Sequence, residues 1–215
     1  MHSNCDQTDM TALINNIDFV ESGMDYIPAN RKKELEQLAS LIKESVLLFG
    51  NAHLNFVCTH NSRRSQLAQI MFSLAFRHYH LGNLNSWSSG TEATAFNHRM
   101  VKALQEFGIT ITKQDDSDNP RYAIIWDRDS EDIQLTFSKV IDDPFNPSKD
   151  FIAVMVCDHA DQNCPFVPGA WKRFSLPYKD PKAFDNTPEE SNAYNEKVLE
   201  IGREMFYIAK ALSQQ

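Results

Sequence analysis

The chain has 215 residues, of which 42% are hydrophobic and 23% charged, so it is long enough for one sizeable core with additions. Its formal net charge of −8 argues against a general nucleic-acid binder, because binding to a phosphate backbone needs clustered Lys and Arg. No apolar run approaches a membrane span, and the first residues lack the basic and apolar segments of a secretion signal. We therefore expect a cytoplasmic protein without nucleic-acid or membrane partners.

Residues 1–50 have the pattern of an N-terminal helical extension. Their clearest signal is a set of apolar residues at three- and four-residue steps, which indicates one face of a helix: Leu35, Leu38, Ile42 and Val46. Asn30 is placed to cap this helix, and Gly50 to end it. We expect residues 51–215 to form the main α/β domain.

The main domain begins with a predicted strand that ends at Cys58, because residues 54–57 include an apolar run. A helical pattern follows this strand, and Trp87 to Gly90 then indicates a second strand and a turn. Asn97 is placed to cap a further helix that Gly108 closes.

Residues 113–150 have a different character, with many Asp, Asn and Pro residues and with apolar and polar residues in alternation. The segments 122–126 and 133–137, with a polar turn at 127–130 between them, predict a β-hairpin. We interpret this region as an insertion at the edge of the domain.

Residues 151–156 form a continuous apolar run, which is typical of a buried parallel strand, and Cys157 follows directly. Residues 187–190 resemble a capping box with Pro188 at the first position of a last amphipathic helix. Strands that alternate with helices predict a parallel sheet covered by helices, and ligands bind at the carboxyl ends of such strands. Cys58 and Cys157 are both expected there.

The loop after the first strand reads Cys-Thr-His-Asn-Ser-Arg-Arg-Ser over residues 58–65 and leads into a helix. Free backbone N–H groups at a helix start bind phosphate-like anions, and the helix dipole lowers the pKa of a thiol there. The loop therefore predicts Cys58 as a thiolate nucleophile, Arg64 as a bidentate clamp on a tetrahedral anion, and Ser65 as a donor to the sulfur. The residues expected around the anion are Thr59, His60, Asn61, Ser62, Arg63 and Arg64. The alternative for an isolated cysteine is a small buried hydrophobic residue, which the flanking strand, arginine and helix disfavour.

Four cysteines in 215 residues, at positions 5, 58, 157 and 164, are too few and too widely spread for a secreted disulfide framework. Cys157 and Cys164 are either two core cysteines, zinc ligands or a redox pair. Zinc is disfavoured because paired cysteine ligands have two to four residues between them. In a redox pair, Cys157 would attack a species bonded to Cys58, and Cys164 would then attack the resulting disulfide. We expect no bound metal.

Asp180 precedes Pro181 in the loop before the last helix. Asp before Pro is commonly no more than a turn. Beside an oxyanion loop, however, Asp180 becomes a candidate general acid that protonates the oxygen leaving phosphorus or arsenic.

With these residues assembled, the chain resembles the low-molecular-weight protein tyrosine phosphatase superfamily and, within it, the thioredoxin-coupled arsenate reductases. The resemblance covers residues 54–108 and 151 onward, and its most diagnostic segments are 58–65, 89–92, 157–165 and 180–181. The phosphatases share the loop and the Asp-Pro pair, whereas the two spaced thiols of the 157–165 segment resemble the reductases.

The resemblance implies a four-stranded parallel sheet flanked by helices, of the flavodoxin-like type. It implies Cys58 as nucleophile, Arg64 with the loop amides as anion clamp and Asp180 as acid. Cys157 and Cys164 would be resolving thiols, and thioredoxin would act as external reductant, with no bound cofactor. The implied reaction is the reduction of arsenate to arsenite.

Two other functions stay open at this stage. One is a low-molecular-weight phosphatase that hydrolyses phosphotyrosine proteins or small phosphate esters through a Cys58 phosphoenzyme. The other is a non-catalytic module that binds an oxyanion or senses oxidation through Cys58.

The chain departs from the family pattern at three places. His60 stands where the family commonly has Gly, and it is either a simple loop substitution or a residue that lines the pocket. Arg63 stands where the family often has Cys, and it either adds charge near the anion or faces solvent. Residues 1–50 and 113–150 have no counterpart in compact members, and they cover the site, mediate dimerisation or lengthen the fold.

Overall fold

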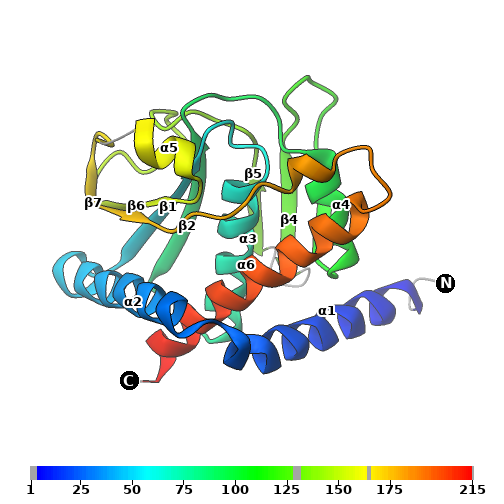
Figure 1. Cartoon of the computed structure of the whole chain (residues 1–215), viewed down its shortest axis with the longest axis horizontal. Coiled ribbons are helices and arrows are strands. Elements are labelled where there is room, and N and C mark those ends of the chain that lie inside the picture. The colour runs from blue at the N-terminus through cyan, green and yellow to red at the C-terminus, as the bar shows by residue number, and fades with distance from the viewer. Residues whose placement is uncertain (1–3, 128–131, 164–165, 215) are drawn as a thin grey trace.

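The computed structural model describes residues 4–127, 132–163 and 166–214 (Figure 1). Its centre is a four-stranded parallel sheet in the order β2-β1-β6-β7. The strands are β1 (Ala52–Cys58), β2 (Leu84–Gly90), β6 (Phe151–Met155) and β7 (Ala170–Ser175). Nearly every residue of β1 and β6 is buried, because these two central strands are covered on both faces. The expected four-stranded parallel sheet is therefore confirmed.

The helices flank this sheet. Helix α3 (Arg64–His78) lies against β1 and β2 and packs along α6 (Glu190–Ser213), which also contacts α4 (His98–Glu106). Figure 1 shows α6 crossing the molecule, with α1 (Asn4–Ser22) below it and α2 (Ala29–Phe49) at the left. A short 3-10 helix, η1 (Gly23–Tyr26), joins α1 to α2. Within the described ranges, no helix is long and apolar enough to cross a bilayer.

A second, antiparallel sheet stands beside the first one. The predicted hairpin is present as β4 (Tyr122–Asp127) and β5 (Asp132–Thr136), although most of its turn lies outside the described residues. A third strand, β3 (Thr110–Lys113), pairs with β4, which the sequence did not predict. The insertion thus forms a sheet of its own with the chain that enters it.

The helix caps test the local predictions. Asn97 accepts a hydrogen bond from the backbone N–H of Arg99 at 3.0 Å, so the cap predicted for α4 is confirmed. The cap predicted at Asn30 is wrong, because Pro28 precedes the first helical residue and places Asn30 inside α2. The capping box predicted at residues 187–190 is wrong as well, since the Thr187 hydroxyl donates to the Phe184 carbonyl instead.

The N-terminal extension contacts the segment that leads to the predicted acid. Arg31 of α2 donates to the Glu204 carboxylate at 2.9 Å and to the Pro177 carbonyl at 3.3 Å. The Tyr178 hydroxyl donates to the same carboxylate at 2.6 Å, and burial raises the pKa of Tyr178 well above its usual value. This buried cluster fixes the chain two residues before Asp180.

Candidate active site

The loop of residues 58–65 joins the end of β1 to the start of α3, as the sequence predicts. Cys58 is buried, and its Sγ lies 3.1 Å from the Ser65 hydroxyl oxygen. The Ser65 hydroxyl also accepts a hydrogen bond from the Asn61 side-chain amide at 2.8 Å, which leaves the hydroxyl proton to point at the sulfur. Ser65 is thus positioned to stabilise a thiolate.

The strained backbone of the loop is at Asn61 and not at His60. Asn61 has a φ of 46°, in the left-handed region, whereas the φ of His60 is not positive. Asparagine tolerates this conformation better than most residues. The His60 side chain is about half exposed, and its Nε2 lies 3.6 Å from the Glu92 Oε2. The chain therefore accommodates His60 in place of Gly without backbone strain at that position.

Gly90, at the end of β2, allows the loop to approach the sheet closely. A Cβ atom at this position would lie 2.6 Å from the Thr59 carbonyl oxygen and 2.7 Å from the Asn61 nitrogen, and it would also overlap the Glu92 carbonyl oxygen. These neighbours are backbone atoms, which cannot move aside as a flexible side chain does. A side chain at position 90 would therefore push the loop away.

Arg64 is held by the segment that follows β7. Its Nη1 donates to the Tyr178 carbonyl at 2.9 Å, and its Nη2 donates to the Asp180 carboxylate at 2.8 Å. Its buried Nε has no hydrogen-bond partner among the described residues. A buried donor without a partner is costly, and an anion in the loop would supply one.

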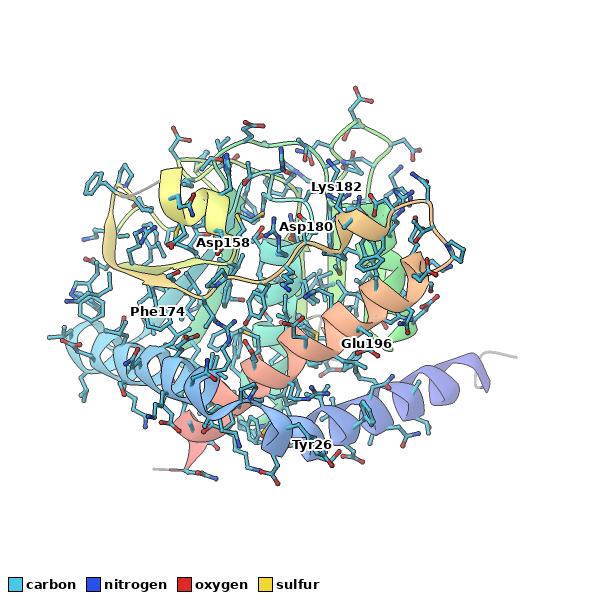
Figure 2. The ribbon with its side chains drawn as sticks, in the orientation of Figure 1. Tyr26, Asp158, Phe174, Asp180, Lys182 and Glu196 are labelled. Atoms are coloured by element: carbon cyan, nitrogen blue, oxygen red, sulfur yellow. The ribbon has the colours of Figure 1, made fainter. Side chains whose placement is uncertain are left out.

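Asp180 forms the turn that its sequence context predicts, and it also contacts the arginine of the loop. One carboxylate oxygen caps the short helix η2 (Pro181–Phe184) by accepting from the Lys182 N–H at 3.0 Å, and the other accepts from Arg64. Figure 2 shows Asp180 and Lys182 on the segment between β7 and α6. The turn thus presents the carboxylate to the same guanidinium that is expected to clamp the anion.

The remaining loop side chains have partners outside the loop. Arg63 donates to the Tyr194 hydroxyl at 2.7 Å and to Asp185 at 3.0 Å, and its side chain is 13% exposed. Arg63 therefore does not face solvent, and these partners keep its guanidinium from turning freely toward an anion in the loop. The Ser62 hydroxyl donates to the Ala95 carbonyl at 2.7 Å.

Cys157 lies two residues after the end of β6, the strand that pairs with β1, so the two buried thiols lie at the same edge of the sheet. The Thr59 hydroxyl oxygen lies 3.6 Å from the Cys157 Sγ and 3.3 Å from the His159 Nδ1. The residue next to Cys58 is thus in contact with Cys157. The other predicted resolving thiol, Cys164, lies outside the described residues.

Two residues of the insertion support the loop although no sequence pattern predicts them. The Ser138 hydroxyl donates to the His60 carbonyl at 2.9 Å, and the Lys139 N–H donates to the Asn61 side-chain oxygen at 2.9 Å. The Lys139 carbonyl also accepts from the Gly90 N–H at 2.9 Å. The contacts of Ser138 with His60 and of Lys139 with Asn61 join residues 78 positions apart, so no local pattern predicts them.

Comparisons with known proteins agree with this geometry. A family model described as low molecular weight phosphotyrosine protein phosphatase matches residues 53–122. The arsenate reductase of Bacillus licheniformis is 32% identical over 149 residues, which are 68% of this chain and 87% of that protein. The arsenate reductase of Bacillus subtilis is 30% identical over 157 residues, with 72% and 93% covered.

Two solved structures share the fold. The first is a low-molecular-weight phosphotyrosine phosphatase from Vibrio cholerae, with a TM-score of 0.52, 15% identity, and coverage of 77% of this chain and 99% of that one. The second is a low-molecular-weight protein tyrosine phosphatase from Bacillus subtilis, with a TM-score of 0.50, 18% identity, and coverage of 76% and 98%. At these identities the likeness concerns the fold.

Proposed function

Because this chain belongs to the arsenate reductases of the low-molecular-weight phosphatase superfamily, we propose that it reduces arsenate to arsenite with three cysteines. The observation that carries the proposal is the contact between Thr59 and Cys157, which brings a second thiol to the loop of Cys58. A hydrolytic phosphatase needs the loop and the acid, but it has no use for this thiol.

In the first step, the Cys58 thiolate attacks the arsenic of an arsenate ion bound by the loop amides and Arg64. A sulfur–arsenic bond forms, and the oxygen on the opposite side leaves as water after Asp180 donates a proton to it. Arsenic stays in the +5 state. The Ser65 hydroxyl, 3.1 Å from the sulfur, stabilises the thiolate before the attack.

In the second step, the Cys157 thiolate attacks the Cys58 sulfur. The sulfur–arsenic bond breaks, its electron pair goes to arsenic, and arsenite leaves in the +3 state. A disulfide between Cys58 and Cys157 forms. Cys164 then attacks the Cys157 sulfur, which frees Cys58 and leaves a disulfide between Cys157 and Cys164.

The last disulfide needs an external dithiol, for which we propose thioredoxin. It attacks the disulfide, accepts it by exchange and returns both cysteines to thiols, so the reductase itself needs no bound cofactor. This cycle requires a reducing compartment such as the cytoplasm.

The second candidate function is hydrolysis of phosphotyrosine or small phosphate esters. It is favoured by the contact between Arg64 and Asp180 at 2.8 Å, because a clamp and an acid beside one thiol are sufficient for phosphoryl transfer. In that reaction water would hydrolyse the Cys58 phosphoenzyme, and Cys157 would take no part.

The deciding experiment is steady-state turnover of arsenate with thioredoxin, thioredoxin reductase and NADPH. We expect Cys157→Ser to stop multiple turnover, while Cys5→Ser, which removes a thiol of α1, keeps the wild-type rate. Retained multiple turnover in Cys157→Ser would falsify the relay.

The same variants separate the two functions with an aryl phosphate as substrate. If the protein is a phosphatase, Cys157→Ser keeps the hydrolysis rate and Asp180→Ala lowers it by about 10²–10⁴-fold. A wild-type protein that is inert toward aryl phosphates but active toward arsenate would rule out hydrolysis as its function.

A further inference from the structure

A cavity lies away from the oxyanion loop, between α3, β2 and β5. It has a volume of about 220 Å³, and none of its lining residues belongs to the loop of residues 58–65. The residues that matter for its chemistry are Arg77, Trp87, Ile133, Leu135, Lys139 and Phe145. The insertion supplies four of these six, so compact members of the family are not expected to have this cavity.

Lys139 brings a buried ammonium group to this cavity. Lys139 is 2% exposed, and its Nζ lies 5.0 Å from the centre of the Phe137 ring and 6.0 Å from the centre of the Phe145 ring. Among the described residues, no hydrogen bond or ion pair neutralises the Nζ. Burial lowers the pKa of Lys139 to about 8, while the charge of Asp143 acts in the opposite direction. A buried cation of this kind favours an anion beside it.

The other cation of the cavity is already neutralised. Arg77 donates to both carboxylate oxygens of Asp132, at 2.7 Å and 2.9 Å, and its guanidinium lies over the Trp126 ring. Among the described residues that line the cavity, Lys139 therefore carries the one unpaired positive charge. A ligand with one negative charge matches it, whereas a phosphate dianion would leave a charge uncompensated.

The cavity also has hydrophobic side chains in its lining. Three of its side chains are large, hydrophobic and exposed: Ile133 by 51%, Phe145 by 44% and Leu135 by 37%. Exposed apolar side chains around a concave surface are typical of ligand sites. The volume is below the roughly 300–1,000 Å³ of pockets for drug-sized ligands, so the ligand is small.

We propose that this cavity binds a small monocarboxylate whose carboxylate pairs with Lys139 and whose short apolar body covers Leu135 and Phe145. The main chain of Lys139 is fixed on both sides, by the Asn61 side-chain oxygen and by the Gly90 N–H, so the fold determines where its amine lies. A group that is positioned before binding loses little freedom when the ligand arrives.

The test is calorimetric titration of the full chain with benzoate, in buffer containing saturating inorganic phosphate to occupy the oxyanion loop. We expect benzoate to bind with a Kd on the order of 1 mM or tighter, and the neutral benzamide to bind at least about tenfold more weakly. The absence of binding by the wild type, or competition between benzoate and phosphate, would overturn the proposal.

Two variants locate the binding. Lys139→Met keeps the length of the side chain without its charge, and we expect it to weaken benzoate binding by about tenfold or more. The matched control is Lys149→Met, at a lysine whose side chain is 81% exposed, and it should bind as the wild type does. Leu135→Trp keeps the amine but fills the mouth, and it should weaken binding even if Lys139→Met does not fold. Wild-type affinity in Lys139→Met or in Leu135→Trp would contradict the proposed site.

Discussion

The two buried thiols of the sheet edge have different surroundings. Around Cys58, the side chains of Asn61, Ser62 and Arg63 each form a hydrogen bond with a distant part of the chain. Cys157 instead lies between β6 and the short helix α5 (Asp158–Asn163). Among the described residues, the polar contacts of this helix with the rest of the fold include those of His159 with Thr59 and of Asp161 with Arg173 and Ser175.

The difference matches the two tasks that we propose. The nucleophile must face an anion in one geometry, so a fixed loop favours it. The second thiol must first reach Cys58 and later react with Cys164, which a rigid surrounding would oppose. In the proposed relay, α5 rearranges and the loop does not. The following predictions test this contrast, from the largest expected effect to the smallest.

Cys58→Ser has the largest expected effect. Both proposed reactions begin with this sulfur, so we expect turnover of arsenate and of aryl phosphate to fall by at least about 10⁴-fold. Inorganic phosphate should still bind, because the amides and Arg64 remain, and titration calorimetry can measure this. Residual turnover near the wild-type rate would show that another group attacks the substrate.

Arg64→Lys should lower the rate of either reaction by about 10²–10³-fold. A lysine presents a point charge and cannot reproduce the planar fork, including the Nε donor that has no protein partner in the described structure. The matched control is Arg63→Lys, whose parent side chain is bound to Tyr194 and Asp185. Initial rates should show a clearly smaller loss for the control, and equal losses would mean that Arg63 also contacts the anion.

Gly90→Ala should destabilise the fold by about 1–3 kcal/mol, because its Cβ would overlap three backbone atoms around the loop. Gly82→Ala is the matched control, since a Cβ there meets nothing within 4 Å, and it should change stability by less than about 0.5 kcal/mol. Urea denaturation followed by circular dichroism measures both values. Equal free energies of unfolding for the two variants would mean that the loop is less tightly held than the geometry indicates.

Thr59→Val has the smallest expected effect, and it tests the contact between the two thiol sites most directly. It removes the hydroxyl that lies 3.6 Å from Cys157 and keeps the shape of the side chain. The loss of one hydrogen bond of about 1 kcal/mol should slow arsenate turnover by roughly tenfold or less, with a smaller change for aryl phosphate. If the variant loses more of its turnover rate with aryl phosphate than with arsenate, Thr59 acts on Cys58 and not on Cys157.

Local sequence patterns were sufficient to predict much of the fold and the position of the loop. The apolar runs before Cys58 and Cys157, the cap at Asn97 and the alternation over 122–137 each depend on neighbours in the sequence. For the same reason, the strand-to-helix position of the loop could be predicted without knowing what packs on it.

The rest depends on contacts between distant residues. The directions of Arg63 and Arg64 are decided by Tyr194, Tyr178 and Asp180, which lie more than a hundred positions away. Ser138 lies in a region whose sequence indicates only a hairpin, yet it supports the backbone of the loop. Position 60 suggested a need for glycine, but the left-handed residue is the neighbouring Asn61.

The cluster of Arg31, Glu204 and Tyr178 limits how this protein can be shortened. A fragment that starts at Asn51 would contain all four strands of the parallel sheet, but it would leave the Glu204 carboxylate buried without its cation, at a cost of about 3–5 kcal/mol. In any descendant that loses the N-terminal helices, Glu204 would have to change as well. Arg31 and Glu204 should therefore be inherited together.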